Sequence, residues 1–348
     1  MKYGRNQINK AGEVLMTSQD KEEVQRALEK INDWRMLHLP ALDALQNEVM
    51  SMLNEIPVFF SSRRIKRLSS IQYKLDINPD MRLGGMQDIG GLRIVFEGIE
   101  DLQKARAILD SQVPTSFELV KPMDYINSPK ESGYRGIHYI YRYHSENQDL
   151  DGMRLELQIR TRLQHYWAMA VETAELVTNT RLKSSFGSDE WLDFFKIVSS
   201  LFAIKEGTPI LQKHLDDGED SRSLMVSLYR ANHEHMFCDT LKALKTSISF
   251  AQNRNRFEDG YYILKIDFET KRVRVYTFSN NNEQQAMDNY SVLEQELVEG
   301  KDAMVLVSVP KMKELWEAYP SYFLNTQEFI GLIETIIDNC QTRGYLGS

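Results

Sequence analysis

The chain has 348 residues, of which 42% are hydrophobic and 26% charged, and its formal net charge is −8. This composition is typical of a soluble globular protein that is long enough for two domains. The negative charge argues against a protein that coats nucleic acid non-specifically, but it does not exclude a local basic groove. No apolar run approaches the roughly 20 residues of a membrane span, so we expect no membrane partner.

The cysteine count and the N-terminal segment predict a cytoplasmic protein. Only Cys238 and Cys340 are present, so we expect neither a disulfide framework nor a zinc site. Residues 1–7 lead into polar sequence without the apolar core of a secretory signal. The grouping of His233, His235 and Cys238 falls in an expected helix, where residues two apart face different sides, so we do not interpret it as a metal site.

The first sixty residues predict helices. Val24, Leu28 and Ile31 follow helical spacing, and Asp20 is available as a cap. Pro40 interrupts this pattern before an apolar stripe resumes. A further helix is expected from about residue 63 to residue 75, before the turn-forming segment 78–80.

An alternating β and α region follows, and three of its segments are rich in strand-forming residues. The expected strands are 92–96, 137–143 and 155–159, and the expected helices are 101–109, 163–174, 191–211 and 221–250. Alternation then predicts a β-hairpin over 262–275 and a strand over 303–309, with helices after it. We therefore expect an α/β domain over 1–210, a helical connector over 211–255 and a small α+β domain over 256–348.

The strand at 155–159 places two kinds of residue in strict alternation. Three apolar side chains, at 155, 157 and 159, point to one face, whereas Arg154, Glu156, Gln158 and Arg160 point to the other. An ordinary half-exposed strand shows the same pattern. The neighbouring segments, which also carry charged residues, favour a site for phosphate transfer.

Phosphate transfer needs cations for the phosphates, carboxylates for magnesium and a group that acts on the attacking hydroxyl. Asp88 and Glu156 could supply the carboxylates, because Mg²⁺ usually takes only one or two from the protein. Glu156 could also, or instead, accept the hydroxyl proton.

A basic segment precedes Asp88. In the expected helix, Lys66, Ser70 and Lys74 follow one another at intervals of four residues, so one cationic edge could cover a triphosphate. An exposed basic helix face is the alternative interpretation.

The loop 133–136 places Tyr134 between two glycines. An exposed tyrosine can stack on a base, and Arg135 and His138 could approach phosphates. The alternative is a hairpin turn with a packing tyrosine.

In their order along the chain, these motifs resemble the RelA/SpoT-type pyrophosphokinase domain over roughly residues 20–210. The motifs are Arg64-x-Lys66-x3-Ser70-x3-Lys74, Asp88-x2-Gly91-x-Arg93, Lys130-x2-Gly133-Tyr134-Arg135-x2-His138 and Glu156-x-Gln158-x-Arg160-Thr161. The resemblance implies a nucleotidyltransferase-like fold with a mixed, mostly antiparallel sheet flanked by helices. ATP would donate its β,γ-pyrophosphate to a ribose 3′-hydroxyl.

The resemblance also implies a role for each motif position. ATP would be bound by Arg64, Lys66, Ser70 and Lys74, with Arg93 on its phosphates. Asp88 and Glu156 would hold Mg²⁺, and Glu156 would activate the acceptor hydroxyl. Tyr134 would stack on the acceptor base, and Lys130, Arg135, His138 and Gln158 would line that side.

Two positions depart from the pattern of alarmone synthetases. Gly136 stands where serine is usual, and Thr173 stands where the last motif commonly carries histidine. We therefore keep two acceptors open, the 3′ end of tRNA and a nucleotide such as GDP, GTP or an adenosine nucleotide. A catalytically inactive sensor of nucleotide or partner is the third alternative.

The C-terminal segment is similar to that of CapRel-type fused toxin–antitoxins, in which a zinc-finger-like domain without zinc covers the ATP site. Tyr319 and Tyr322 would be the inhibitory pair, although they could also be ordinary packing residues. The resemblance implies an autoinhibited enzyme that modifies the tRNA acceptor end in anti-phage defence. A phage protein, for instance a capsid protein, would bind the C-terminal domain and release the inhibition.

Overall fold

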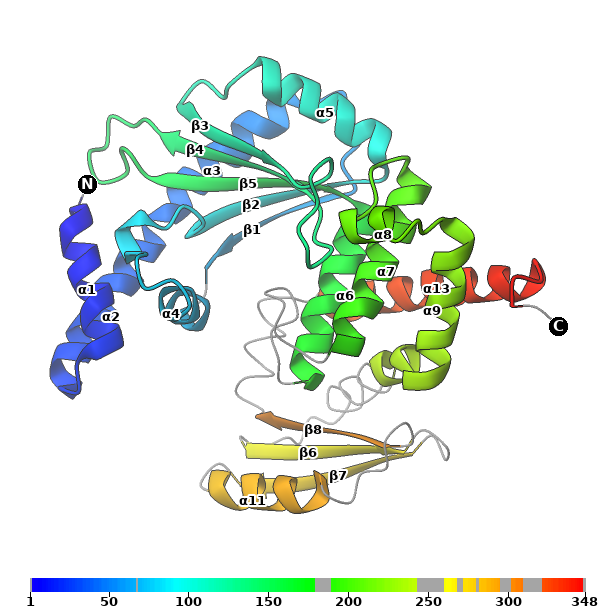
Figure 1. Cartoon of the computed structure of the whole chain (residues 1–348). Coiled ribbons are helices and arrows are strands. Elements are labelled where there is room, and N and C mark those ends of the chain that lie inside the picture. The colour runs from blue at the N-terminus through cyan, green and yellow to red at the C-terminus, as the bar shows by residue number, and fades with distance from the viewer. Residues whose placement is uncertain are drawn as a thin grey trace. The chain divides into compact units, whose positions relative to one another are not determined.

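The computed structural model describes residues 2–66, 68–178, 189–242, 260–267, 272–279, 282–294, 302–308 and 321–346 (Figure 1). The chain forms two compact units. The first comprises Met1–Ser128 and Arg135–Arg162, and the second comprises Pro129–Tyr134 and Leu163–Ser348. The expected boundaries at residues 210 and 255 stay predictions about functional segments.

Three helices open the first unit: α1 (Arg5–Thr17), α2 (Lys21–Met36) and α3 (His38–Met52). The Asp20 side chain accepts hydrogen bonds from the backbone of Glu22 and Glu23, so it caps α2 as expected. Pro40 lies in the first turn of α3, where its missing N–H costs little. The helical prediction for this segment is confirmed.

A five-stranded sheet forms the centre of the first unit. Its strands are β1 (Phe60–Ile65), β2 (Gly90–Phe96), β3 (Phe117–Asp124), β4 (Ile137–Tyr143) and β5 (Arg154–Thr161), in the order β1-β2-β5-β4-β3. Only the pair β2–β5 is parallel, and the other three pairs are antiparallel. The predicted mixed, mostly antiparallel sheet flanked by helices is confirmed.

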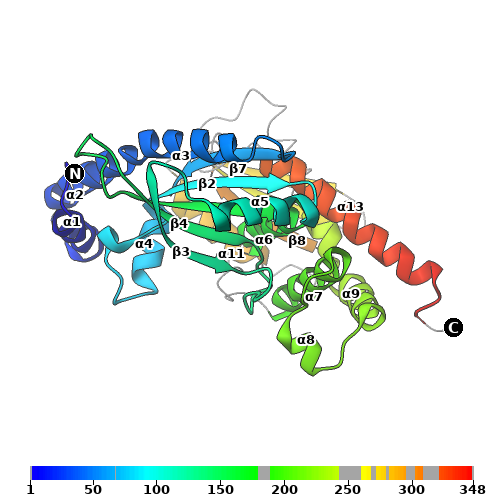
Figure 2. The ribbon, with the colours of Figure 1, turned by 90° about the horizontal axis from the view of Figure 1, so that it is seen from above.

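One face of the sheet is covered by α3 and by α5 (Ile99–Ser111) (Figures 1 and 2). Leu45 of α3, Leu102 of α5 and Leu157 of β5 are all fully buried in the same apolar cluster. The apolar residues of the alternating strands therefore face the helices, and the polar residues of β5 face the other side.

The helix predicted over 63–75 is wrong in its first part. Residues Arg63 and Arg64 belong to β1, which pairs with β2, and α4 (Leu68–Asp76) begins only at Leu68. The basic run hides the strand, because β1 is an edge strand with an exposed face that carries few apolar residues. Strand β3 and the helix α11 (Glu283–Glu294) were not predicted from the sequence.

Helices dominate the described part of the second unit up to residue 242. They are α6 (Arg162–Thr178), α7 (Asp189–Glu206), α8 (Gln212–Asp216) and α9 (Ser221–His235), and α13 (Ser321–Thr342) packs with them. Phe194, Phe195 and Phe202 of α7 contact the ring of Phe329 from α13. The helix predicted over 221–250 is interrupted at Met236, whose φ of 52° is left-handed and ends α9.

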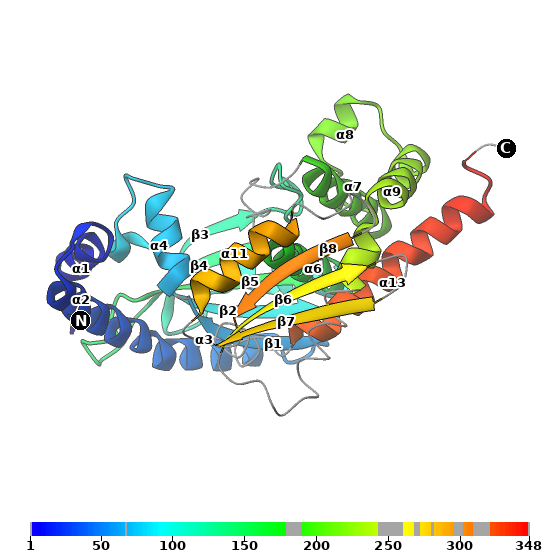
Figure 3. The ribbon, with the colours of Figure 1, turned by 90° about the horizontal axis from the view of Figure 1, so that it is seen from below.

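A second, antiparallel sheet has the order β7-β6-β8, with β6 (Gly260–Asp267), β7 (Arg272–Ser279) and β8 (Asp302–Ser308). The predicted hairpin and third strand are confirmed. Helix α11 (Glu283–Glu294) runs along this sheet (Figure 3). Within the described residues, no helix has the length and apolar character required to cross a membrane.

Candidate active site

The polar face of β5 is a buried row of charge and amide groups. Leu155, Leu157 and Ile159 on the other face are 0% exposed, and Glu156, Gln158 and Arg160 are only 8%, 6% and 3% exposed. An ordinary half-exposed strand would present such groups to water. The interpretation of residues 155–159 as an ordinary half-exposed strand is therefore wrong. Burying so much polarity requires partners.

Those partners form one hydrogen-bonded line. His138 Nδ1 lies 2.8 Å from Glu156 Oε1, and Gln158 Nε2 donates to Glu156 Oε2 at 2.5 Å. Arg160 Nη2 donates to Gln158 Oε1 at 2.8 Å. The strand register explains this line, because β4 places His138 directly opposite Gln158.

Glu156 is ionised in this environment. Burial raises its pKa, but the hydrogen bond and charge at His138, the bond from Gln158 and the charge of Arg64 outweigh burial and hold the pKa well below the usual range. A carboxylate with so low a pKa is a weak base. The arrangement as it stands therefore favours Glu156 as a charge that holds a cation, and less as a proton acceptor.

Asp88, two residues before β2, is the second carboxylate, and its side chain is partly buried, with 18% of it exposed. Lys66 Nζ donates to its Oδ2 at 2.8 Å, and Lys74 Nζ lies 3.0 Å from Oδ1 and 3.1 Å from Oδ2. Burial raises the pKa of Asp88, but the two lysine charges outweigh burial and lower it. Lys66 and Lys74 thus meet at Asp88, and the prediction that Lys66 shares a helix face with Ser70 and Lys74 is wrong, because α4 begins only at Leu68.

The other expected donors of positive charge lie around these carboxylates. Arg64 on β1 is paired in register with Gly91, and Gly91 is paired on its other side with Glu156. Arg93 of β2 is paired with Gln158 and is 8% exposed. Ser70 lies on α4, one turn before Lys74.

Gly91 belongs to one of the motifs named from the sequence, but the sequence gives it no role. A Cβ at this position would lie 3.7 Å from Cγ and 3.9 Å from Nε of Arg64, which is ordinary van der Waals contact. The backbone of β2 at Gly91 therefore lies alongside the Arg64 side chain, and the available space would also accept a small side chain.

The donor set suits magnesium. Two ionised carboxylates, one on β5 and one just before the neighbouring strand β2, match the oxygen ligands that Mg²⁺ takes from a protein, with phosphate oxygens and water as the remaining ligands. Asp88 and Glu156 also influence each other electrostatically, as neighbouring like charges do. The residues present therefore fit the ion that the sequence predicts.

The residues expected on the acceptor side divide between the two units. Arg135 and His138 belong to the first unit, whereas Lys130 and Tyr134 belong to the second. The Lys130 Nζ atom lies 5.2 Å from the centre of the Tyr134 ring, which is a cation–π contact. Tyr134 is only 8% exposed, so the expectation of an exposed ring is wrong.

Arg135 is buried and braces the backbone. Its Nη1 donates to the Ile126 carbonyl at 3.3 Å, and its exposed fraction is 3%. The sequence-based role of Arg135 on phosphates stays a prediction, as do the acceptor roles of Lys130 and Tyr134. Tyr319 lies outside the described residues, and Tyr322 lies in α13 with its side chain outside the description.

Residues 63–176 match the family described as "Region found in RelA / SpoT proteins". GTP pyrophosphokinase YjbM of Bacillus subtilis (strain 168) is 35% identical over 117 residues, which cover 32% of this chain and 54% of that protein. GTP pyrophosphokinase YwaC of the same organism is 28% identical over 154 residues, which cover 40% of this chain and 72% of that protein. The chain thus spans about half the length of the first of these relatives.

Among solved structures, small alarmone synthetase 1 from Bacillus subtilis, bound to its product pppGpp, is similar with a TM-score of 0.43 and 23% identity. The match covers 54% of this chain and 97% of that one. The matched residues 63–176 contain the strands β2, β3, β4 and β5, the last three residues of β1, and both carboxylates and the cations described above. Residues 63–176 therefore match a region found in RelA/SpoT proteins, and part of the chain is similar in sequence to the Bacillus GTP pyrophosphokinases.

Proposed function

We propose that this chain transfers the β,γ-pyrophosphate of ATP to a ribose 3′-hydroxyl. One observation carries the proposal: two ionised carboxylates lie among cations, namely the buried Glu156 on β5 and the partly buried Asp88, two residues before β2. Removing such charges from water costs desolvation free energy. Their arrangement suits phosphoryl-group chemistry, in which positioning and charge neutralisation supply most of the catalysis.

Each side chain then has a task on the donor side. Lys66 and Lys74 release Asp88 and bind the ATP phosphates instead. Arg64 and Arg93 add positive charge around the phosphates, and Ser70 adds a hydroxyl. Asp88 and Glu156 would hold Mg²⁺, which when bound supplies charge neutralisation at the phosphate oxygens. The new bond joins the acceptor 3′-oxygen to the β-phosphorus, AMP leaves, and the hydroxyl loses its proton.

On the acceptor side we assign tasks to His138, Gln158 and Arg135 of the first unit, and Lys130 and Tyr134 keep the acceptor roles that the sequence resemblance implies. If the acceptor hydroxyl displaces the Gln158 amide from Glu156, the carboxylate loses a stabilising hydrogen bond and becomes a stronger base. This exchange would allow Glu156 to accept the proton although its resting pKa is low.

For the acceptor itself, we propose the 3′-terminal adenosine of tRNA, in the cytoplasm. The departures from the alarmone-synthetase pattern support this choice. Gly136 has a φ of +150°, and a Cβ there would lie 3.1 Å from Arg160 Cγ, so the usual serine would displace Arg160. Thr173 directs its hydroxyl to the Met169 carbonyl inside its own helix.

A guanosine nucleotide is the second candidate, because the named relatives are GTP pyrophosphokinases. ATP labelled at the γ-phosphate separates the two candidates when it is incubated with the full chain and either tRNA or GDP and GTP. Label on tRNA alone supports the first acceptor, and label on the guanosine nucleotides alone contradicts it.

The matched variants for this assay are Glu156→Gln and Glu13→Gln. Glu156→Gln keeps the shape of the side chain but removes its charge, so transfer should fall roughly a hundredfold or more. Glu13 is an exposed residue of α1 that pairs with Arg82 at 3.4 Å, and its variant should retain full activity. If neither protein transfers label to any acceptor while ATP still binds, the chain is an inactive sensor.

We further propose that residues 256–348 inhibit the enzyme until a phage protein binds them. The separate C-terminal sheet outside the RelA/SpoT region supports this assignment. Tyr319→Ala or Tyr322→Ala should then raise the toxicity of the expressed protein without a trigger. Tyr345→Ala, at a tyrosine that contacts Arg222, serves as the control, and equal toxicity of all variants would refute the switch.

A further inference from the structure

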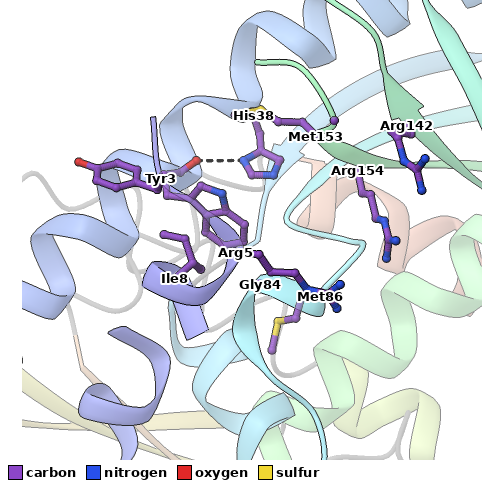
Figure 4. Close-up of a pocket in the computed structure, with 11 residues that line it drawn as sticks. Tyr3, Arg5, Ile8, His38, Gly84, Met86, Arg142, Met153 and Arg154 are labelled. Atoms are coloured by element: carbon purple, nitrogen blue, oxygen red, sulfur yellow. Dashed lines mark hydrogen bonds between the residues drawn. The ribbon is translucent and has the colours of Figure 1, made fainter. Parts of the chain in front are cut away.

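A cavity of about 170 Å³ in the first unit lies apart from the carboxylates of the proposed reaction (Figure 4). Helices α1, α2 and α3, the glycine-containing turn at Gly84 and the strands β4 and β5 line it. Figure 4 shows Arg142 and Arg154 extending from neighbouring strands in the same direction, on the side toward which Arg5 also extends. The charged residues that line the cavity are Arg5, Arg142 and Arg154. His38 also lines it but is neutral.

Two of these arginines are held directly opposite each other by the sheet. Arg142 of β4 and Arg154 of β5 are register partners in an antiparallel pair, and like charges in that position are destabilising. Arg142 Nη1 has a carboxylate partner in Glu118 at 3.0 Å, and His144 lies 3.7 Å from the same carboxylate. Glu118 is thus the carboxylate partner of Arg142, whereas Arg154 lies opposite Arg142 on the next strand.

The third arginine comes from the first residue of α1. Burial lowers the pKa of Arg154, and the positive charges of Arg142 and Arg5 lower it further. Among the described residues, the guanidinium groups of Arg5 and Arg154 form no hydrogen bond or ion pair. The α1 backbone fits closely against Gly84, where a Cβ would lie 2.9 Å from both Cγ and the carbonyl oxygen of Arg5.

Asp33 and His38, which lie near the cavity, do not neutralise the charges of Arg5 and Arg154. The Asp33 carboxylate is occupied by Lys2 at 2.7 Å and by the Tyr3 hydroxyl at 2.6 Å. Burial lowers the pKa of His38 to about 4, so this residue is neutral at physiological pH. Its Nδ1 lies 3.0 Å from the Trp34 carbonyl, the hydrogen bond drawn in Figure 4.

The size and the chemistry of the cavity limit its ligand. Sites for complete small molecules measure roughly 300–1,000 Å³, so this cavity suits a group of a few heavy atoms. Guanidinium forks match the oxygens of phosphate groups and hold them by paired hydrogen bonds. An anion with at least two charges would also relieve the repulsion among the arginines.

We propose that Arg5, Arg142 and Arg154 bind a compact phosphate anion, either free pyrophosphate or the diphosphate end of a nucleotide, at a site separate from Glu156. The ligand would join the N-terminal end of α1 to the β4–β5 hairpin. This inference does not depend on the proposed pyrophosphate transfer, because it concerns different residues.

Hydrogen–deuterium exchange of the full chain tests the inference, because it reports where a ligand binds. With inorganic pyrophosphate, and separately with ADP, peptides covering residues 2–12 and 141–154 should become protected. Arg154→Gln and Arg5→Gln should each raise the apparent Kd for this protection at least tenfold, and Arg26→Gln, at an exposed arginine of α2, should not change it. Protection by pyrophosphate but not ADP identifies a free anion, and protection by both identifies the diphosphate group.

Arg154→Gln should fold normally, because it removes a like charge from the group of three, and its unfolding temperature should equal or exceed that of the wild type. The absence of protection at residues 2–12 and 141–154 with either ligand would overturn the proposal. Protection that persists in both variants would also overturn it. Protection by a single-stranded oligoribonucleotide alone would assign the surface to RNA and contradict a small-anion site.

Discussion

At the scale of single residues, the main feature of the candidate site is a group of charges that are largely shielded from water and lie close together. Glu156 and Asp88 retain their charge because each has cationic or hydrogen-bonding neighbours at about 2.5–3.1 Å. The motif spacing predicted the identity of these residues. It could not predict that Lys66 and Lys74 both bind Asp88, because that contact depends on a strand ending at Ile65 where a helix was expected.

The pH dependence of stability belongs to this scale, because it can be traced to His38. This residue is 2% exposed and burial lowers its pKa to about 4. Between that value and the ordinary histidine pKa, the unfolded chain binds a proton that the folded chain does not. Stability is therefore lost as pH falls from about 6.5 to about 4, by about 3 kcal/mol in total.

Chemical denaturation between pH 4 and 7 measures this loss. His38→Gln should flatten the slope of the unfolding free energy in that window, whatever its effect at pH 7. A wild-type free energy that is constant over the window would contradict the assignment.

At the scale of elements, the loop between β3 and β4 depends on a glycine that the second unit surrounds. Gly133 has a φ of +93°, and its carbonyl accepts a hydrogen bond of 2.6 Å from Ser199. A Cβ there would lie 3.0 Å from the Trp167 ring and 3.1 Å from Ser199 Cβ. The sequence indicated a loop here, but the packing around it depends on α6 and α7, which are remote in sequence.

Gly133→Ala should therefore destabilise the chain by about 2 kcal/mol or more, because it combines backbone strain with overpacking. Gly331→Ala offers the opposite case, since this glycine lies within α13 with open space around its Cα. That change should stabilise by up to about 1 kcal/mol through helix propensity. Denaturant unfolding of both variants checks the two signs, and equal effects would contradict the packing argument.

At the scale of the whole molecule, periodicity predicted most helices and strands, because a buried stripe leaves a clear pattern in the sequence. Residues 137–143, for example, form β4 with the predicted bounds. Patterns failed where tertiary contacts decide the structure, as at the edge strand β1 and at the left-handed Met236. The candidate active-site residues could be named from the sequence because their order along the chain resembles RelA/SpoT motifs, whereas the arginine cavity has no such motif.

The central claim is that Asp88 and Glu156 serve pyrophosphate transfer. The most direct test is to identify the adenine nucleotide that remains after ATP has reacted. Transfer of the β,γ-pyrophosphate leaves AMP, whereas transfer of one phosphoryl group leaves ADP. We predict that the wild-type chain, with Mg²⁺ and its acceptor, forms AMP in equal amount to the modified acceptor, and that Glu156→Gln forms almost none. Formation of ADP in place of AMP, or full AMP formation by Glu156→Gln, would contradict the account.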